Sequence, residues 1–302
     1  MAVYKRTYKP YTGRLTEAGR RFLVIPRYAF HGMFDSRPVL AFYVLCFLPL
    51  LVSAATIYLS HNPAAQALLS MDGRDLFKID RFFFSRLFLF QSVLSFMLTT
   101  WVGTGLISAD LSNDALPLYL CRPFSRAEYV LGKLSVIAIL ISMITWVPGL
   151  MLFALQANMA GWDWFVSNYW MAGSIVLGSW IWITLVALLV LAISSWVKWR
   201  VAATAMMLGV FFVPPGVGEA FNEVLRTNWG KVLNLGYLAG QMWDGLFGVV
   251  NPVPRTFNRE YVASPQFENL PAWSAWIVFA LVAGACLWIL NRRLQAKEVV
   301  RG

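Results

Sequence analysis

The side chains with the most chemistry available to them lie in one polar segment, residues 108–133, which reads SADLSNDALPLYLCRPFSRAEYVLGK. Its carboxylates, hydroxyls and basic groups could bind a protein partner or a polar ligand. Apolar runs long enough to cross a bilayer flank it, at 82–107 and 134–156. Because lipid tails cannot hydrogen-bond to these groups, we expect the segment to contact something other than lipid.

Capping residues predict a rigid local structure within this segment. Asp114 is a favourable N-cap for a short helix over 115–120, since its carboxylate can accept from free amides of the first turn. Pro123 then ends that helix, because proline lacks an N–H and restricts the residue before it. Ser125 and Glu128 have the spacing of a capping box in front of the next apolar run. The segment is therefore predicted to form a short helix, a break and a new helix.

Other kinds of chemistry lack the residues they need. The two histidines, His31 and His61, are predicted on opposite sides of the membrane, so they cannot build a metal site together. Gly132-Lys133 looks like the end of a phosphate-binding loop, but Ala127 stands where such a loop has its first glycine. We therefore predict no metal site, no catalytic residue, no bound cofactor and no ATP hydrolysis by this chain.

The composition is that of an all-α integral membrane protein. Of the 302 residues, 59% are hydrophobic and only 13% are charged, with a mean hydropathy of +0.60. A hydrocarbon core about 30 Å thick needs about 20 helical residues. Six spans are predicted, at 38–59, 82–107, 134–156, 169–197, 201–218 and 271–290. The fifth is predicted to be short or broken, because Pro214-Pro215-Gly216 interrupts it.

The distribution of charge predicts that both termini and the polar segment are cytoplasmic. The loops on their side of the six spans carry 17 of the 25 basic residues but only six of the 15 acidic residues. By the positive-inside rule, this side faces the cytosol. The net charge of +10 is therefore mostly a topology signal, and nucleic-acid binding is not predicted. We expect a multi-pass protein of the cell membrane, in contact with the lipid bilayer.

Two further segments complete the predicted organisation, which is one transmembrane domain over 38–302 after a cytoplasmic tail at 1–37. Residues 17–37 place apolar side chains on one helical face and basic ones opposite, which predicts an amphipathic elbow helix in the membrane interface. A solvated tail with the same periodicity is the alternative. Residues 214–270 are rich in aromatic side chains and far longer than an ordinary loop, and we predict short re-entrant or interfacial helices on the external side.

The second span carries a polar stripe, Gln91, Ser95 and Thr99, at intervals of four residues. Such a stripe joins helices by hydrogen bonds or lines a path for a substrate, and either role requires it to face protein. Arg86 is the only charge within any predicted span, and its place near the external end predicts a side chain that reaches to the interface. The spans contain no carboxylate or histidine, which disfavours proton-coupled transport.

The polar segment resembles the coupling helix of type-2 ABC transporter permeases, the exporters whose ATPase is often a separate polypeptide. The likeness rests on an acidic residue, a short helix, an Arg-Pro-x-x-Arg motif and a Gly-Lys pair. In this chain the matching positions are Asp110, residues 116–120, Arg122, Pro123, Arg126, Tyr129, Gly132 and Lys133. The predicted elbow helix, six spans and long external segment are also similar to that family.

The resemblance implies a permease subunit of an ATP-driven exporter, which pairs with a second copy or a paralogue. It also implies that a separate ABC ATP-binding subunit binds ATP and Mg and docks on residues 110–126. The implied docking and coupling residues are Asp110, Asp114, Leu116, Leu118, Tyr119, Arg122, Pro123, Phe124 and Arg126, with Ser125 and Glu128 capping the loop. One alternative is a membrane scaffold or mechanotransmission subunit that uses the same ATPase without moving a solute. A membrane-embedded enzyme is disfavoured, since catalytic residues do not cluster.

Overall fold

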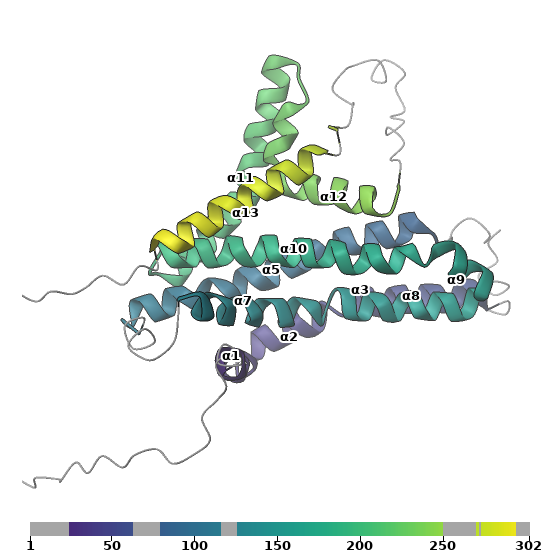
Figure 1. Ribbon diagram of the computed structural model, residues 1–302, viewed down its shortest axis with the longest axis horizontal. Coiled ribbons are helices and arrows are strands. Elements are labelled where there is room, and N and C mark those ends of the chain that lie inside the picture. Colours follow the sequence, from purple (N-terminus) through teal and green to yellow (C-terminus); the bar gives the residue numbers. More distant parts are fainter. Residues whose placement is uncertain (1–23, 63–78, 116–125, 250–269, 272, 294–302) are drawn as a thin grey trace, which may run out of the picture.

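The computed structural model describes residues 24–62, 79–115, 126–249, 270–271 and 273–293, and regular structure within these ranges is helical (Figure 1). The elements are α1 (Val24–Phe34), α2 (Arg37–Leu45), α3 (Leu48–His61), α5 (Arg81–Ser112), α7 (Arg126–Ser142), α8 (Trp146–Ala160), α9 (Trp162–Asn168), α10 (Trp170–Trp196), α11 (Arg200–Leu225), η2 (Trp229–Leu233), α12 (Leu235–Leu246) and α13 (Trp273–Arg293).

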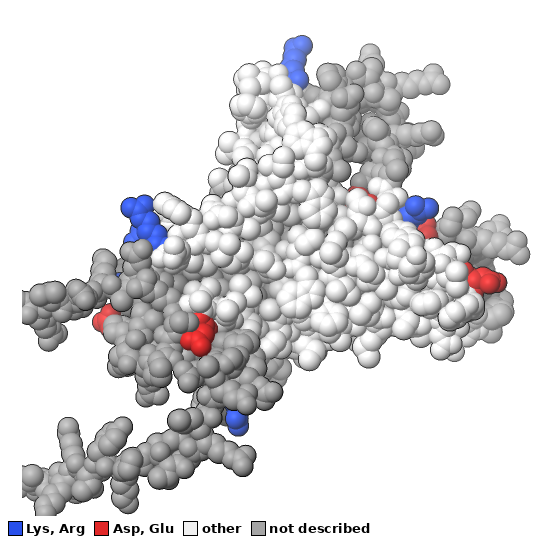
Figure 2. Space-filling model, in the orientation of Figure 1, with Lys and Arg blue, Asp and Glu red and all other residues white. Residues whose placement is uncertain are grey.

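Six helical stretches in the described ranges are long and apolar enough to cross a membrane, so the chain is a multi-pass membrane protein. They cover Arg37–His61, Arg81–Ser112, Ala127–Ala160, Trp170–Trp196, Arg200–Leu225 and Trp273–Arg293. Each overlaps one predicted span, which confirms the all-helical class and the six spans. Figure 2 shows charged side chains at the ends of the bundle and at the tip of α11, with a broad uncharged face between them.

The fifth span differs from its prediction, because Pro214 and Pro215 lie inside α11 instead of interrupting it. The helix continues past residue 218 to Leu225 and ends where Arg226 takes a left-handed conformation, with φ at 49°. Each proline removes one helical N–H, but its fixed φ suits a helix and the residues beyond it keep their own bonds. The predicted interruption at this pair of prolines is therefore wrong.

Two other spans are interrupted instead. The first divides into α2 and α3 at residues 46–47, and the third divides into α7 and α8 at 143–145. Each of the second halves has a proline in its first turn, Pro49 in α3 and Pro148 in α8. A proline there is tolerated within its own helix but cannot donate to the helix before it. The length and hydropathy of the apolar runs did not reveal these breaks.

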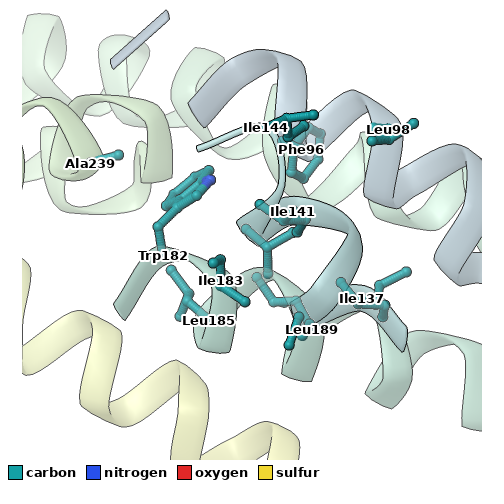
Figure 3. Close-up of a cluster of buried hydrophobic side chains, with 14 of the residues drawn as sticks. Phe96, Leu98, Ile137, Ile141, Ile144, Trp182, Ile183, Leu185, Leu189 and Ala239 are labelled. Carbon is teal, nitrogen blue, oxygen red and sulfur yellow. The ribbon is translucent and has the colours of Figure 1, made fainter. Parts of the chain in front are cut away.

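The long helices α5 and α10 form the centre of the bundle and pack along each other. Gly103 permits the close approach, since a Cβ there would lie 2.9 Å from a methyl carbon of Val190. Figure 3 shows apolar side chains of α5, α7 and α10 meeting around Trp182, with Phe96 and Ile141 among them. The Trp182 indole N–H donates to a hydroxyl of α5, so this large buried side chain keeps its polar atom satisfied.

The chain beyond α11 turns back toward the bundle (Figure 1). Gly218 of α11 and Gly230 of η2 meet backbone to backbone, where a Cβ on either would clash with the other's carbonyl oxygen. Asn222 Oδ1 accepts the Gly230 N–H at 2.7 Å and closes this junction. The segment predicted to be re-entrant thus contains the end of α11, η2 and α12, and its part over 250–269 lies outside the described residues.

Candidate functional site

We call the polar segment that joins α5 to α7 the connector (108–133), and the structure describes its two ends. These ends are the last residues of α5 with its C-terminal turn, and the first two turns of α7. The predicted docking residues Leu116, Leu118, Tyr119, Arg122, Pro123 and Phe124, and the predicted cap Ser125, lie outside the described residues. Arg126 is the first residue of α7, and Glu128 follows in its first turn.

Three side chains from the two ends of the connector meet in what we call the connector-end cluster: Asp110, Tyr129 and Lys133. Asp110 Oδ2 accepts a hydrogen bond from the Tyr129 hydroxyl at 2.6 Å and pairs with Lys133 Nζ at 2.7 Å. Tyr129 and Lys133 are four residues apart, so they lie on the same face of α7. The Lys133 ammonium also lies 5.5 Å from the centroid of the Tyr129 ring.

Burial makes this cluster a strong joint. Tyr129 is 1% exposed, and the side chains of Lys133 and Asp110 are 8% and 17% exposed. A buried charge that loses its partner costs about 3 to 5 kcal/mol, because water no longer solvates it. The end of α5 and the start of α7, which carry the two described ends of the connector, are therefore held at a fixed separation.

Asp114 lies at the C-terminal end of α5, with φ at 49°, in the left-handed region. The N–H of Ala115 donates to the carbonyl of Asp110 at 2.8 Å, which is the six-to-one bond of a Schellman turn. This geometry ends α5, whereas an N-cap residue usually has an extended backbone. The short helix that Asp114 was predicted to begin, over 115–120, lies almost wholly outside the described residues.

A second cluster of charged groups lies at the other end of α5, and we call it the opposite-end cluster: Ser85, Arg86 and Asp244. The Arg86 guanidinium pairs with Asp244 of α12, and the Ser85 hydroxyl donates to the same carboxylate oxygen at 2.5 Å. Asp244 is 5% exposed. Arg86 therefore has a buried carboxylate partner, which the interfacial role predicted for it did not include. Nothing in the spans' composition pointed to Asp244, since it lies in the segment after α11.

The C-terminal end of α12 is held to the bundle by further hydrogen bonds beside this cluster. Ser174 Oγ of α10 donates to the Leu246 carbonyl at 2.7 Å, and Arg81 donates to the Gly248 carbonyl at 3.2 Å. The Trp243 indole N–H donates to Ser92 Oγ at 2.9 Å. The first two bonds satisfy carbonyls at the end of α12 and just beyond it, where a helix leaves them free, and together the three bonds fix the position of α12 against α5 and α10.

The polar stripe of α5 is buried and faces protein, with Gln91, Ser95 and Thr99 all at most 1% exposed. Ser95 Oγ accepts from the Trp182 indole of α10 at 2.9 Å. Gln91 Nε2 donates to backbone carbonyls of two other spans, while Thr99 bonds within its own helix. Of the two roles open to this stripe, joining helices is the one these contacts support.

Comparison with known proteins adds no family to this picture. No model of a known protein family matches the chain, and a search of curated proteins finds no match. Within the described residues, no three His, Cys, Asp or Glu side chains come together in a way that could hold a metal ion. The connector-end cluster is therefore the arrangement from which a function is best argued.

Proposed function

We propose that this chain is the membrane-spanning permease subunit of an ATP-driven ABC exporter. In this proposal the connector docks a separate ATP-binding subunit, which binds ATP and Mg. The observation that carries the proposal is the buried joint of Asp110, Tyr129 and Lys133, which ties the connector to two spans at once. A docking loop must transmit a displacement into the membrane, and a loop fixed to two helices does so as a rigid body.

The joint also determines which helices a displacement of the connector would move. α5 is 32 residues long and packs against α10, α11 and α12, so it contacts most of the bundle. α7 begins the third span and packs against α1, the described part of the predicted elbow helix. A push on the connector would therefore reach both the central helix pair and the interfacial helix. The excess of basic residues supports a cytoplasmic location for the connector and both termini.

A second permease copy or a paralogue completes the proposed transporter. Of the six candidate spans found among the described residues, the fifth and the first are the least buried, with 17% and 22% of their apolar windows buried, against 72% for the fourth. Their apolar faces are thus available to a second permease as well as to lipid. A transporter of this kind would enclose its path between two such chains, since α5 and α10 pack against each other within one.

Co-purification with a candidate ABC ATP-binding subunit tests the docking proposal. We expect Arg122→Glu and Phe124→Asp, both in the connector, to reduce ATPase association by at least about tenfold, which corresponds to about 1.4 kcal/mol. Arg226→Glu is the matched control, because it reverses an exposed charge beyond the end of α11. If the ATP-binding subunit associates equally well with both connector variants and with the wild type, the docking assignment is wrong.

Transport itself needs a separate measurement, because a scaffold or mechanotransmission subunit would dock the same ATPase. Inverted membrane vesicles containing the permease and its ATPase are supplied with ATP and labelled lipids, peptides or amphipathic drugs. We expect ATP-dependent accumulation of one of these classes. Docking without accumulation across all of them would favour the scaffold.

A further inference from the structure

Two neighbouring spans are broken, and one side chain of α5 joins both breaks. The first span changes from α2 to α3 after Leu45, and the third changes from α7 to α8 after Ser142. Both breaks fall well inside the candidate spans Arg37–His61 and Ala127–Ala160. A break at this depth is unusual, because the hydrocarbon core supplies no water to satisfy the freed backbone groups.

The break in the third span has an identifiable cause. In a continuous helix the N–H of residue 148 would donate to the carbonyl of Ile144, but Pro148 has no N–H. Around the break the N–H groups instead donate to the carbonyl three residues back, from Ile144 to Ile141 at 3.0 Å and from Thr145 to Ser142 at 3.4 Å. The helical ladder is therefore interrupted, and the Ile144 carbonyl needs another donor.

Gln91 supplies that donor and serves the other break as well. Its Nε2 donates to the Ile144 carbonyl at 2.7 Å and to the Cys46 carbonyl at 3.0 Å. Gln91 is fully buried, so no solvent competes for these bonds. A primary amide has two N–H bonds, and here each is directed at one of the two breaks. One side chain thus places the two interruptions side by side at one level of the bundle.

The helices on either side of this level pack as two separate groups. On the connector side, α1 packs against both α2 and α7. On the far side, α3 packs against α8. The long helices α5 and α10 pass the same level without interruption (Figure 1). The breaks therefore divide two spans into halves that belong to different groups, while two continuous helices run beside both.

We propose that the protein bends at this level as at a hinge, and that the hydrogen bonds of Gln91 hold the two breaks together there. The group of α1, α2 and α7 swings against the group of α3 and α8, while α5 and α10 stay straight. α7 has 17 residues and is therefore about 25 Å long, so a rotation of about 10° moves its connector end by about 4 Å. This inference goes beyond the proposed function, because the motion belongs to the isolated chain and needs no ATPase.

Pulsed electron spin resonance on the full chain in lipid nanodiscs tests the hinge. Nitroxide labels are attached at two positions that are exposed in the structure, Leu131→Cys on α7 and Leu177→Cys on α10, in a chain that also carries Cys121→Ser. Gln91→Leu removes both hydrogen bonds and keeps a side chain of similar size. We expect the distance distribution between the two labels to broaden and to shift by several ångströms.

Two controls separate a hinge from general loosening of the bundle. Gln156→Leu changes another buried glutamine, in α8 and away from both breaks, and should leave the distribution as in the wild type. A second label pair, Phe90→Cys with Leu177→Cys, spans the unbroken helices and should stay unchanged in every variant. An unchanged first pair in Gln91→Leu, or equal broadening of both pairs, would overturn the proposal.

Pro148→Ala keeps the proposal testable if Gln91→Leu does not fold. It restores an N–H that can donate to the Ile144 carbonyl, so the third span should become continuous. We expect a narrower distribution between the labels on α7 and α10, and a smaller effect of Gln91→Leu when the two changes are combined. An unchanged width in Pro148→Ala would contradict a hinge at this break.

Discussion

The two ends of α5 carry clusters of the same kinds of side chain, with the burial of the two charges reversed. In the connector-end cluster the cation is the more buried member, with 8% of the Lys133 side chain exposed against 17% for Asp110. In the opposite-end cluster the carboxylate is the more buried member, with 8% of Asp244 exposed against 38% for Arg86. Loss of the better exposed partner would therefore leave an ammonium buried at one end and a carboxylate at the other.

This difference decides how much each end depends on its ion pair. A carboxylate accepts several hydrogen bonds, and Asp244 would keep the one from Ser85 without its arginine. An ammonium only donates, and Lys133 would keep the Tyr129 ring beside it but lose its only carboxylate in the cluster. The connector end should therefore behave as a joint that is either intact or broken, and the opposite end should weaken by degrees.

Asp110→Ala is expected to have the largest effect. It leaves the Lys133 ammonium buried without a counter-charge and should lower the free energy of unfolding by about 3 to 5 kcal/mol. Denaturant titration in detergent micelles, followed by tryptophan fluorescence, measures this change. The ATPase is absent from the measurement, so the result concerns the joint alone.

The double variant Asp110→Ala with Lys133→Met is the control for that prediction. Replacing a buried ion pair by apolar groups is often nearly neutral, so the double variant should recover most of the lost stability. If the double variant is as unstable as Asp110→Ala, the loss comes from packing and not from an uncompensated charge. The contrast between the two ends of α5 would then lose its electrostatic basis.

Arg86→Met is expected to lower the free energy of unfolding by less, about 2 kcal/mol, a typical cost for a buried polar group that loses one partner. Arg86 is partly exposed, so water already screens its interaction with Asp244. The Ser85 hydroxyl also remains in place for the carboxylate. The same titration measures the loss, and a cost above that of Asp110→Ala would reverse the order of the two ends.

The three members of the connector-end cluster are among the residues on which the family resemblance rests, and they are close together in the chain, but no contact between them was predicted from the sequence. Asp110 and Tyr129 are 19 residues apart, on either side of one connector, and Lys133 follows one helical turn later. Asp244 is 158 residues from Arg86, and no local sequence pattern predicts that α12 packs against the start of α5. Pairings of that separation depend on how the whole chain folds, so Arg86 was assigned to the interface without a partner.

The prolines show the same limit within the spans. Pro214 and Pro215 predicted an interruption where α11 is continuous, while Pro49 and Pro148 lie at real breaks that hydropathy did not reveal. A proline removes the same N–H at every position. At the break in the third span the freed carbonyl of Ile144 has a distant donor, Gln91, which lies 53 residues away in the sequence. The six spans follow from local apolar length, but the breaks follow from tertiary contacts.

The smallest effects come from removing a single hydroxyl at each end. Tyr129→Phe and Ser85→Ala each delete one donor to a carboxylate that keeps its cation, and a hydrogen bond to a charged group contributes about 1.5 to 3 kcal/mol. We expect both losses near the lower limit, with Ser85→Ala the larger, because Asp110 is exposed enough for water to replace the lost donor and Asp244 is not. Denaturant titration of the two variants side by side measures the difference. A larger loss in Tyr129→Phe would mean that the hydroxyl at the connector end matters through its position between two helices, and burial of the carboxylate would not explain the contrast.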